Sequence, residues 1–218
     1  MYKKIKIFCG PNTYNFSSLY FEEANEYLVG VDSGLEYLLK IDKKIDLAIG
    51  DFDSINPSVL GQIENKCKKI ISLDKDKNMT DLSYALDYIY NNMDYDDIEV
   101  YGGISGRIDH FLANINLIIK YNFSIRDDNH YIFILKKGKH EIKNFKKYIS
   151  FFALEDVYDL TLKDFKFELN SYYLSTTDSL CVSNEGSGFV EFHKGKLLVV
   201  MSDEIWHLDI EEESLWKK

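Results

Sequence analysis

Strand-length apolar runs alternate with amphipathic helical patterns through the first half of this chain. Residues 6–9, 27–31, 47–49, 69–73 and 99–101 each have the length and apolar content of a buried strand. Between some of them, apolar side chains recur at helical spacing, most clearly over residues 82–90 and, after the last run, 108–119. Parallel strands need a crossover connection, usually a helix. The alternation therefore predicts a mostly parallel sheet with helices on both faces, an α/β/α domain.

The pattern changes near residue 129 to short segments rich in aromatic and β-branched residues. These segments span residues 131–135, 148–153, 158–162, 165–169, 180–182, 189–192 and 197–201, and glycine-containing turns separate several of them. Such spacing is typical of an all-β unit, most economically a sandwich. We therefore expect two domains, an α/β domain over residues 1–125 and a β-sandwich over residues 126–218. A short polar hinge at residues 124–129 would join them.

Net charge and cysteine content indicate which partners and which cellular compartment to expect. The formal net charge of −10 argues against a nonspecific nucleic-acid binder, which needs a basic surface. The three cysteines are far apart and have no CxxC spacing, so we expect free thiols in a reducing compartment. No apolar run has the length of a signal-peptide core or a membrane span. These features predict a cytoplasmic protein that binds neither nucleic acid nor membrane.

Acidic residues stand at or just after the expected strand ends of the first half. At a parallel sheet these ends meet at one edge, where ligands of α/β proteins bind. We therefore expect the following loops to converge. They are Asp32-Ser33-Gly34, Gly50-Asp51-Phe52-Asp53-Ser54, Lys77-Asn78-Met79-Thr80-Asp81, and a segment over residues 102–110 that contains Gly102, Gly103, Gly106, Arg107, Asp109 and His110.

Converging carboxylates repel one another, so a cation must offset their charge. Mg²⁺ takes oxygen ligands and is usually held by a few carboxylates together with substrate phosphates. Glycines before a helix, followed by Arg107, provide backbone amides and a guanidinium fork for phosphate oxygens. Taken singly, each feature has a structural reading: Asp32 and Thr80 as helix caps, Asp51 and Asp53 as an acidic turn, His110 as a satisfied helix histidine. Together they favour a Mg²⁺-dependent phosphoryl-transfer site.

Three functions remain open on the residues alone. The site could transfer a phosphoryl or pyrophosphoryl group to an acceptor. A Mg²⁺-dependent phosphohydrolase would use the same aspartates with water as the acceptor. A non-catalytic nucleotide sensor would need the glycine and arginine loop but has little reason to keep four carboxylates.

These loops, in this order, resemble the thiamine pyrophosphokinase family. The most specific matches are GDFDS at residues 50–54 and GGISGRIDH at residues 102–110, and residues 183–185 match the family's SNE segment. The resemblance implies a homodimer with a β-sandwich second domain and active sites shared between subunits. It implies transfer of the pyrophosphoryl group of ATP to the hydroxyl of thiamine, with release of AMP. Two positions depart from the family pattern: Ser33 replaces a glycine, although it is small enough to cap the helix, and Asn78 replaces an acidic residue.

The resemblance also implies roles for individual residues. The α/β domain would bind ATP, and the β-sandwich would bind thiamine and form the dimer. Asp51, Asp53 and Asp81 would hold Mg²⁺, one of them would take the hydroxyl proton, and Asp109 would orient Arg107 or complete the metal shell. The residues that would bind ATP are Asp32 at the margin of the site, Gly102, Gly103, Ser105, Gly106, Arg107, His110 and, as a weaker candidate, Lys77. Those that would bind thiamine are Thr80 and, from the partner subunit, Ser183 and Asn184.

Overall fold

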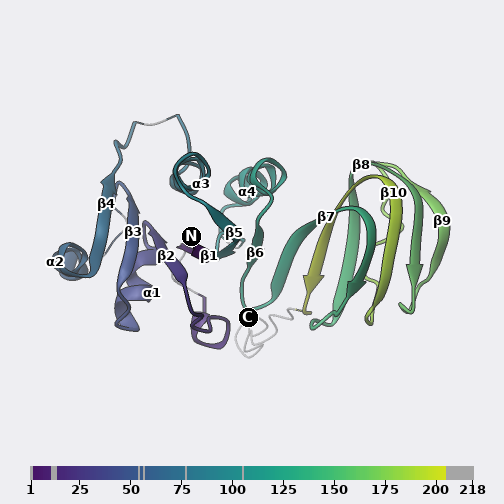
Figure 1. Cartoon of the computed structure of the whole chain (residues 1–218), viewed down its shortest axis with the longest axis horizontal. Helices are drawn as coiled ribbons and strands as arrows, with labels where there is room; N and C mark the ends of the chain where they lie inside the picture. Colours follow the sequence, from purple (N-terminus) through teal and green to yellow (C-terminus); the bar gives the residue numbers. More distant parts are fainter. Residues whose placement is uncertain are drawn as a thin grey trace, which may run out of the picture.

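A computed structural model describes residues 2–10, 14–53, 55, 57–76, 78–104 and 106–204. These residues form a ten-stranded sheet in the order β4-β3-β2-β1-β5-β6-β7-β10-β8-β9. Pairing is parallel from β4 through β6 and antiparallel from β6 onward, so the sheet has an α/β part and an all-β part. Figure 1 shows the two parts side by side along the long axis of the molecule.

The α/β part contains the strands predicted for it. They are β1 (Tyr2–Cys9), β2 (Glu26–Val31), β3 (Ile45–Gly50), β4 (Cys67–Ser72) and β5 (Tyr95–Tyr101). β1 lies in the centre, with β2 on one side and β5 on the other. Since the chain runs outward from β1 to β4 and then returns to β5, its direction of winding reverses between β1 and β5. A crevice at such a reversal is where open α/β sheets bind ligands.

Helices cover both faces of this sheet, as predicted (Figure 1). One face carries α1 (Gly34–Lys40) and α2 (Pro57–Lys66), preceded by a short 3₁₀ turn, η1 (Phe16–Ser18). The other carries α3 (Asp81–Asn92) and α4 (Ile108–Tyr121). Alternate side chains of β1 serve the two cores, because successive strand residues point to opposite faces. Ile7 packs with residues of α3 and α4, whereas Phe8 packs with residues of α1.

Helix α2 was not predicted, although α3 and α4 were. Its first two turns contain Pro, Ser and Gly among the apolar residues of positions 57–63, so no long apolar stripe marks it. Its last residues lead directly into the edge strand β4. None of the helices in the described part of the chain is both long and apolar enough to cross a membrane.

The all-β part is built from fewer and longer strands than predicted. They are β7 (His130–Ile142), β8 (Tyr148–Lys163), β9 (Leu169–Leu174) and β10 (Gly188–Ser202). The segments expected at 148–153 and 158–162 are one strand, as are those at 189–192 and 197–201. The strands expected at 165–169 and 180–182 are wrong: those residues form bends and turns, apart from Leu169, which begins β9.

The long strands bend in the middle, which is how four strands form the two layers of a sandwich. The β7–β10 register shifts between Phe192 and Lys196, and Gly138 and Gly195 near this point have φ of 142° and 103°. Side chains from both halves of one strand, such as Phe192 and Val199, pack in the same core. Bulges of this kind sharpen the bend of a strand. Gly138 and Gly195, which were read as turns between strands, are therefore at bends within β7 and β10.

The hinge expected at residues 124–129 is instead part of the sheet. Residues 124–126 form β6 (Ser124–Arg126), which pairs in parallel with β5 and antiparallel with β7. Ile125 is fully buried. Asp127 is only 4% exposed, and its buried carboxylate accepts hydrogen bonds from the backbone amides of Asn129 and His130. The two parts are therefore joined by continuous backbone pairing.

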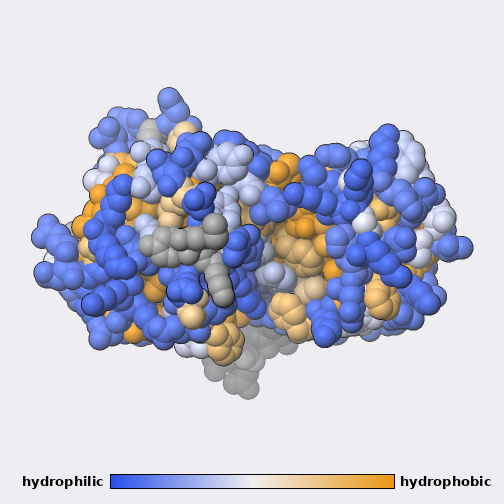
Figure 2. Space-filling model, in the orientation of Figure 1, coloured by the Kyte–Doolittle hydropathy of each residue, from blue (hydrophilic) through white to orange (hydrophobic). Residues whose placement is uncertain are grey.

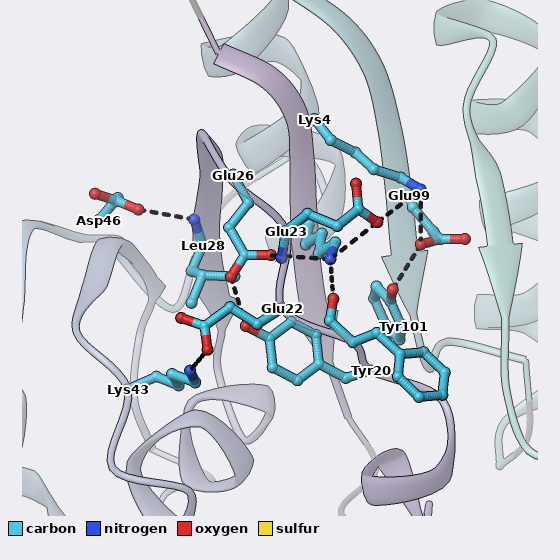
Figure 3. A network of polar contacts seen from close by, with 12 residues as sticks. Lys4, Tyr20, Glu22, Glu23, Glu26, Leu28, Lys43, Asp46, Glu99 and Tyr101 are labelled. Carbon is cyan, nitrogen blue, oxygen red and sulfur yellow. Dashed lines mark hydrogen bonds and ion pairs between the residues drawn. The ribbon is translucent and has the colours of Figure 1, made fainter.

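A buried lysine holds the segment that follows β1 against the sheet, and Figure 3 labels three residues of its network, Tyr20, Glu23 and Glu26. Lys6 is fully buried, and its Nζ lies 2.9 Å from Glu26 and 3.3 Å from Glu23. Its ammonium also donates to the carbonyl of Phe21, and the hydroxyl of Tyr20 donates to Glu26. A buried charge is tolerated when it is paired in this way. The network fixes the segment over β1, on the face that carries α1.

Candidate functional site

A pocket of about 340 Å³ lies at the carboxyl edge of the parallel strands, on the face that carries α3 and α4. Four segments distant in sequence meet there: three of the four loops that were predicted to converge and, in place of the loop after β3, the end of β1. They are the ends of β1 and β2, the start of α3, and the loop and helix start that follow β5. The lining residues include Cys9, Gly10, Asp32, Ser33, Thr80, Asp81, Gly103, Gly106, Arg107, His110 and Asn114.

Asp32 lies at the centre of the acidic residues, although we expected it at the margin. Its carboxyl is hydrogen-bonded to that of Asp81 and lies within electrostatic reach of Asp51. Burial, and then the charges of Asp81 and Asp51, raise its pKa to about 7. Its Oδ1 is buried and has no hydrogen-bond partner among the described residues. Both observations mark a place where negative charge is concentrated and not yet offset.

Gly50 makes room for this carboxylate. A Cβ atom at residue 50 would lie 1.9 Å from Oδ1 of Asp32, which is an impossible contact. The amide of Asp32 donates to the carbonyl of Ile49, so the backbone there is held in place. The glycine of the GDFDS segment is therefore required by the acidic cluster.

We expect Gly50→Ala to displace Asp32 and to destabilise the protein by about 1 to 3 kcal/mol, as is typical of overpacking. Gly61→Ala is the matched control, because a Cβ at residue 61 of α2 would meet nothing within 4 Å. Alanine is the better helix former, so this control should leave stability unchanged or raise it by about 0.5 to 1 kcal/mol. Thermal unfolding of both variants measures the difference. Equal stabilities would contradict the close packing of Gly50 on Asp32.

The raised pKa of Asp32 predicts a pH dependence of stability in the ligand-free protein. The carboxyl titrates at about 7 in the folded state against 3.8 for an unperturbed aspartate, so the folded state binds this proton more tightly. The resulting stabilisation is fully present below pH 4 and is lost as the pH rises through 7, with a magnitude of about 2 to 4 kcal/mol. Asp32→Asn removes this contribution. The melting temperature of the variant should rise relative to the parent between pH 5 and 8, and a constant difference would contradict the assignment.

Asp51 and Asp53 occupy a tight turn directly after β3. The amide of Asp53 donates to Oδ1 of Asp51 over 3.2 Å, and Phe52 between them has a φ of 58°, which is rare for an aromatic residue. Asp53 is half exposed and pairs with Lys75 at 3.0 Å, outside the pocket lining. Ser54 lies outside the described residues. The turn thus brings Asp51 toward Asp32 and leaves Asp53 paired with Lys75 outside the pocket lining.

No completed metal site is present in the described part of the chain, where no three His, Cys, Asp or Glu side chains are grouped closely enough to hold an ion. The predicted set of Asp51, Asp53 and Asp81 is therefore only partly gathered. Asp81 adjoins Asp32 in the pocket, Asp51 lies near them, and Asp53 faces Lys75.

The glycine segment after β5 is shaped by its own hydrogen bonds. The amides of Gly102, Gly103 and Ile104 donate to the carbonyl of Arg126, the carbonyl of Gly10 and the hydroxyl of Tyr14. Gly102 and Gly103 have φ of 94° and 73°, and a Cβ at Gly102 would lie 2.2 Å from the carbonyl oxygen of Cys9. We expected both glycines to bind phosphate, but these amides are already engaged. Their contribution is the shape of the loop, which presents Gly106 and the start of α4 to the pocket.

Arg107 and Asp109 form a two-bond ion pair at the start of α4. Nε and Nη2 of Arg107 donate to Oδ1 and Oδ2 of Asp109 over 3.1 and 2.5 Å. The hydrogen bonds from Arg107 lower the pKa of the Asp109 carboxyl. Of the two roles expected for Asp109, this geometry matches the orientation of Arg107. Both side chains are exposed, and His110 also lines the pocket, whereas Ser105 and Lys77 lie outside the described residues.

Thr80 was interpreted both as a helix cap and as a residue of the binding site, and its position fits both. Its hydroxyl caps α3 by accepting the amide of Ser83 over 3.2 Å, and the residue also lines the pocket. Asp81 follows in the first turn of α3, where the helix dipole favours a carboxylate. Ser33 does not cap α1, and its hydroxyl faces Gly10 instead.

Ser183 and Asn184 are not part of this pocket within one chain. Asn184 is 2% exposed, and its side chain bonds the backbone of Phe167 in both directions, at 2.9 and 2.7 Å. Its backbone pairs with Ile149 of β8. Asn184 therefore holds the loop between β9 and β10 on the sandwich, while Ser183 beside it is exposed and has a φ of 57°.

Sequence reasoning missed residues that support the pocket. Asn114 of α4 is 6% exposed and donates from its side chain to the carbonyl of Gly103 over 2.8 Å. The signal for it was a polar residue on the buried face of α4, in line with Ile118 and Tyr121. Tyr14, which accepts the amide of Ile104, had no such signal because its neighbours form no regular pattern.

Comparison with known proteins agrees with this geometry. Residues 19–132 match the family model "Thiamin pyrophosphokinase, catalytic domain", and residues 132–197 match "Thiamin pyrophosphokinase, vitamin B1 binding domain". The thiamine pyrophosphokinase of Bacillus subtilis (strain 168) is 36% identical over 185 residues, which is 80% of this chain and 86% of that protein.

Solved structures of such enzymes have the same fold. The crystal structure of thiamine pyrophosphokinase from Bacillus subtilis superposes with a TM-score of 0.82 at 32% identity, covering 93% of this chain and all of that one. That of the enzyme from Geobacillus thermodenitrificans gives 0.79 at 27% identity, covering 94% and 98%. This chain, in which Asp32, Asp51 and Asp81 lie close together beside a glycine loop, thus shares its fold with these enzymes over nearly its whole length. The chain belongs to the thiamine pyrophosphokinase family.

Proposed function

We propose that this protein transfers the pyrophosphoryl group of ATP to the hydroxyl of thiamine, giving thiamine diphosphate and AMP. The observation that carries the proposal is the acidic group of Asp32, Asp81 and the nearby Asp51, of which Asp32 and Asp81 line the same pocket as the start of α4. The family match over both halves of the chain supports thiamine as the acceptor. Residues 1–125 would bind ATP, and residues 126–218 would bind thiamine and form the dimer.

The residues present fit Mg²⁺. The buried Oδ1 of Asp32 has no hydrogen-bond partner among the described residues, and the pKa of this carboxyl is raised by burial and then by the neighbouring carboxylates, so a cation at this point would relieve the repulsion. We propose Asp51, Asp53 and Asp81 as ligands, with Asp32 beside them. Mg²⁺ is commonly held by one or two carboxylates plus phosphates and water, so the set need not be gathered before ATP binds. Bound there, the ion would neutralise phosphate charge as it develops.

The chain's own groups would position the reactants. Arg107, oriented by Asp109, and the first turn of α4 bind phosphate oxygens, because the first amides of a helix lack intrahelical partners. His110 lies one residue further and lines the same wall. We include Gly106, Ser105 and Lys77 in the phosphate site as predictions.

The reaction is an in-line displacement at the β-phosphorus of ATP. A bond forms between the thiamine hydroxyl oxygen and this phosphorus, the bond to the α–β bridging oxygen breaks, and AMP leaves with the electron pair. One carboxylate of the group takes the hydroxyl proton. The acidic pocket also suits thiamine, since its thiazolium ring is positively charged.

We propose a homodimer with shared sites. Thiamine needs a further wall, because none of the described residues that line the pocket belongs to the all-β part. Exposed apolar side chains occur at both places that a partner would join: Ile108 and Leu112 on α4, 74% and 58% exposed, and Leu180 and Val182 beside Ser183, 55% and 42% exposed. Figure 2 shows hydrophobic surface in the hollow between the two parts.

We also propose a cytoplasmic location, which the free cysteines favour, because thiols stay reduced there.

Product analysis separates this function from the two alternatives. With ATP, Mg²⁺ and thiamine, the proposed enzyme gives AMP, and it gives none when thiamine is left out. A phosphohydrolase releases phosphate or pyrophosphate whether or not thiamine is present. A nucleotide sensor binds ATP and turns over nothing. ³¹P NMR of the three reaction mixtures distinguishes these results.

Arg107→Lys should raise the KM for ATP about tenfold or more and leave the KM for thiamine within twofold. Lysine keeps the charge but loses the planar fork that binds two oxygens at once. Asp109→Asn should also raise the KM for ATP, because the guanidinium of Arg107 is then no longer held in place by a carboxylate. The double variant should then be less impaired than the product of the two single effects. An Arg107→Lys enzyme with parental constants would exclude contact between this side chain and the phosphates.

A further inference from the structure

The peptide unit between Gly103 and Ile104 is held by side chains at both of its polar groups. Its carbonyl oxygen accepts a hydrogen bond from Nδ2 of Asn114 over 2.8 Å, and its N–H donates to the hydroxyl of Tyr14 over 3.1 Å. In a planar trans peptide the C=O and the N–H point in opposite directions. Two side chains therefore hold this peptide from opposite sides, Asn114 from α4 and Tyr14 from the segment between β1 and η1.

This peptide differs from those that precede it in the loop. The amides of the two glycines after β5 donate to backbone carbonyls, so these bonds depend on the course of the chain. The Gly103–Ile104 peptide depends on two side chains instead. Gly103 has a φ of 73° and no Cβ, and glycine restricts its neighbouring peptides less than any other residue does. The orientation of this peptide is therefore set by Asn114 and Tyr14.

Tyr14 is itself fixed in place. Its ring packs on that of the buried Phe16 with centroids 5.3 Å apart, and a Cβ at Gly102 would lie 3.0 Å from the ring. The amide of the next residue, Asn15, donates to the carboxylate of Asp128 over 2.8 Å. Asp128 lies between β6 and β7, so the junction with the all-β part anchors the segment that carries Tyr14.

Asn114 engages a carbonyl oxygen that would otherwise add to the negative charge of the acidic pocket. Gly103 and Asn114 both line this pocket, together with Asp32 and Asp81. Asn114 is 6% exposed, so its amide meets the Gly103 carbonyl away from bulk water. A carbonyl oxygen without a donor would carry its partial negative charge into a place where phosphates already meet carboxylates. The amide of Asn114 offsets that charge.

The Gly103–Ile104 peptide also directs the chain toward the phosphate-binding turn. Gly106 lines the pocket two residues after Ile104, and Arg107 is the N-cap of α4. Rotation of the peptide changes the direction of the chain that follows, and so moves the guanidinium and the first amides of α4 relative to the carboxylates. A displacement of about 1 Å in groups that position a substrate can lower a rate about a hundredfold.

We propose that Tyr14 and Asn114 are positioning residues for pyrophosphoryl transfer, which act by holding the Gly103–Ile104 peptide in one orientation. Each acts through the loop that presents Gly106 and Arg107 to the phosphates. The inference rests on the proposed function for the use of this loop. It adds two side chains from different parts of the chain on which the geometry of the loop depends.

The first test measures kinetics and stability of three single variants and one double variant. Tyr14→Phe removes the acceptor and keeps the ring, and Asn114→Leu removes the donor and keeps the approximate size. Tyr121→Phe is the matched control: its hydroxyl, also on a side chain of α4, donates to Asp87 over 2.9 Å, outside the pocket lining. For each full-length protein, kcat, the KM values for ATP and thiamine, and the melting temperature are determined.

The proposal predicts a kcat/KM for ATP lowered about tenfold or more in Tyr14→Phe and in Asn114→Leu, with the KM for thiamine within twofold of the parent. The double variant should fall no more than about twofold below the weaker single variant, because either change alone already frees the same peptide. Tyr121→Phe should keep parental kinetics even if its melting temperature falls. Parental rates in both single variants, losses that multiply in the double variant, or an equal loss of rate in Tyr121→Phe would overturn the proposal.

The second test follows the Ile104 amide in the ligand-free protein and needs no turnover. Hydrogen exchange is measured by NMR on full-length protein labelled with ¹⁵N-isoleucine, and the signal of Ile104 is identified by its absence in Ile104→Val. Exchange should be at least tenfold faster in Tyr14→Phe and also in Asn114→Leu, although Asn114 bonds the carbonyl and not this amide. Parental protection in Asn114→Leu would overturn the proposal. If the parent forms no thiamine diphosphate, the proposed function fails, and the exchange rates still decide whether both side chains hold this peptide.

Discussion

Asp81→Asn is expected to lower the turnover of thiamine diphosphate formation at least a hundredfold while leaving the fold intact. The amide keeps the shape of the side chain but loses the charge that a divalent cation requires. Because Asp81 adjoins the raised-pKa carboxyl of Asp32, its loss relieves repulsion in the ligand-free protein. The melting temperature should therefore hold or rise. Asp51→Asn should behave alike, and Asp53→Asn should lose as much activity if Asp53 leaves Lys75 to bind the metal.

Asp96→Asn is the matched control for this series. Asp96 is exposed near the start of β5, at the opposite edge of the sheet from the pocket, so its removal should change neither turnover nor melting temperature. Parental activity in Asp81→Asn would show that the acidic group is not the metal site. A parental rate in Asp53→Asn alone would restrict the ligands to the carboxylates that already adjoin Asp32.

Mixed dimers should regain activity that neither parent variant has. Ser183→Arg places a bulky cation on an exposed loop of the all-β part, where it should repel the thiazolium ring of thiamine, and Asp81→Asn damages the acidic pocket. If each site combines the pocket of one subunit with the Ser183 loop of its partner, a mixed dimer has one intact and one doubly damaged site. Random exchange of equal amounts then restores about a quarter of the parental sites.

Asn184→Ala is unsuited to this experiment, because Asn184 is buried and bonded to the backbone of Phe167, so its loss should destabilise the loop itself. The mixture is compared with each variant incubated alone. Subunit exchange is verified by native mass spectrometry of chains of different mass. Verified exchange with no gain in rate would place both residues in a site made by one chain and reject the shared arrangement.

The α/β half was predictable because its local patterns agree with its tertiary structure. Four of the five predicted strands there have a stretch that is buried on both faces, which requires a continuous apolar run that can be read directly; β4, which was also expected to be buried, is a mostly exposed edge strand. The all-β half was less predictable because its strands bend. A strand of 16 residues such as β8 changes layers within its length, and its sequence then looks like two strands.

The candidate site was predictable as a set of loops but not as a geometry. Strand ends converge in any parallel sheet, which is why Asp32, Asp81 and Arg107 could be placed at one edge. The central position of Asp32 depends on the missing side chain of Gly50, and the engaged amides of Gly102 and Gly103 depend on Gly10 and Arg126. These contacts join residues far apart in the chain, so no local sequence pattern predicts them.

The fate of the two transferable phosphorus atoms of ATP tests the central claim most directly. ATP labelled with ³²P at the β position, and separately at the γ position, is incubated with the parent protein, Mg²⁺ and thiamine. Pyrophosphoryl transfer predicts that both labels enter thiamine diphosphate in equal amounts, with one AMP released for each molecule formed. Appearance of the γ label alone in thiamine phosphates with ADP as the second product, or of either label only as inorganic phosphate or pyrophosphate, would contradict it.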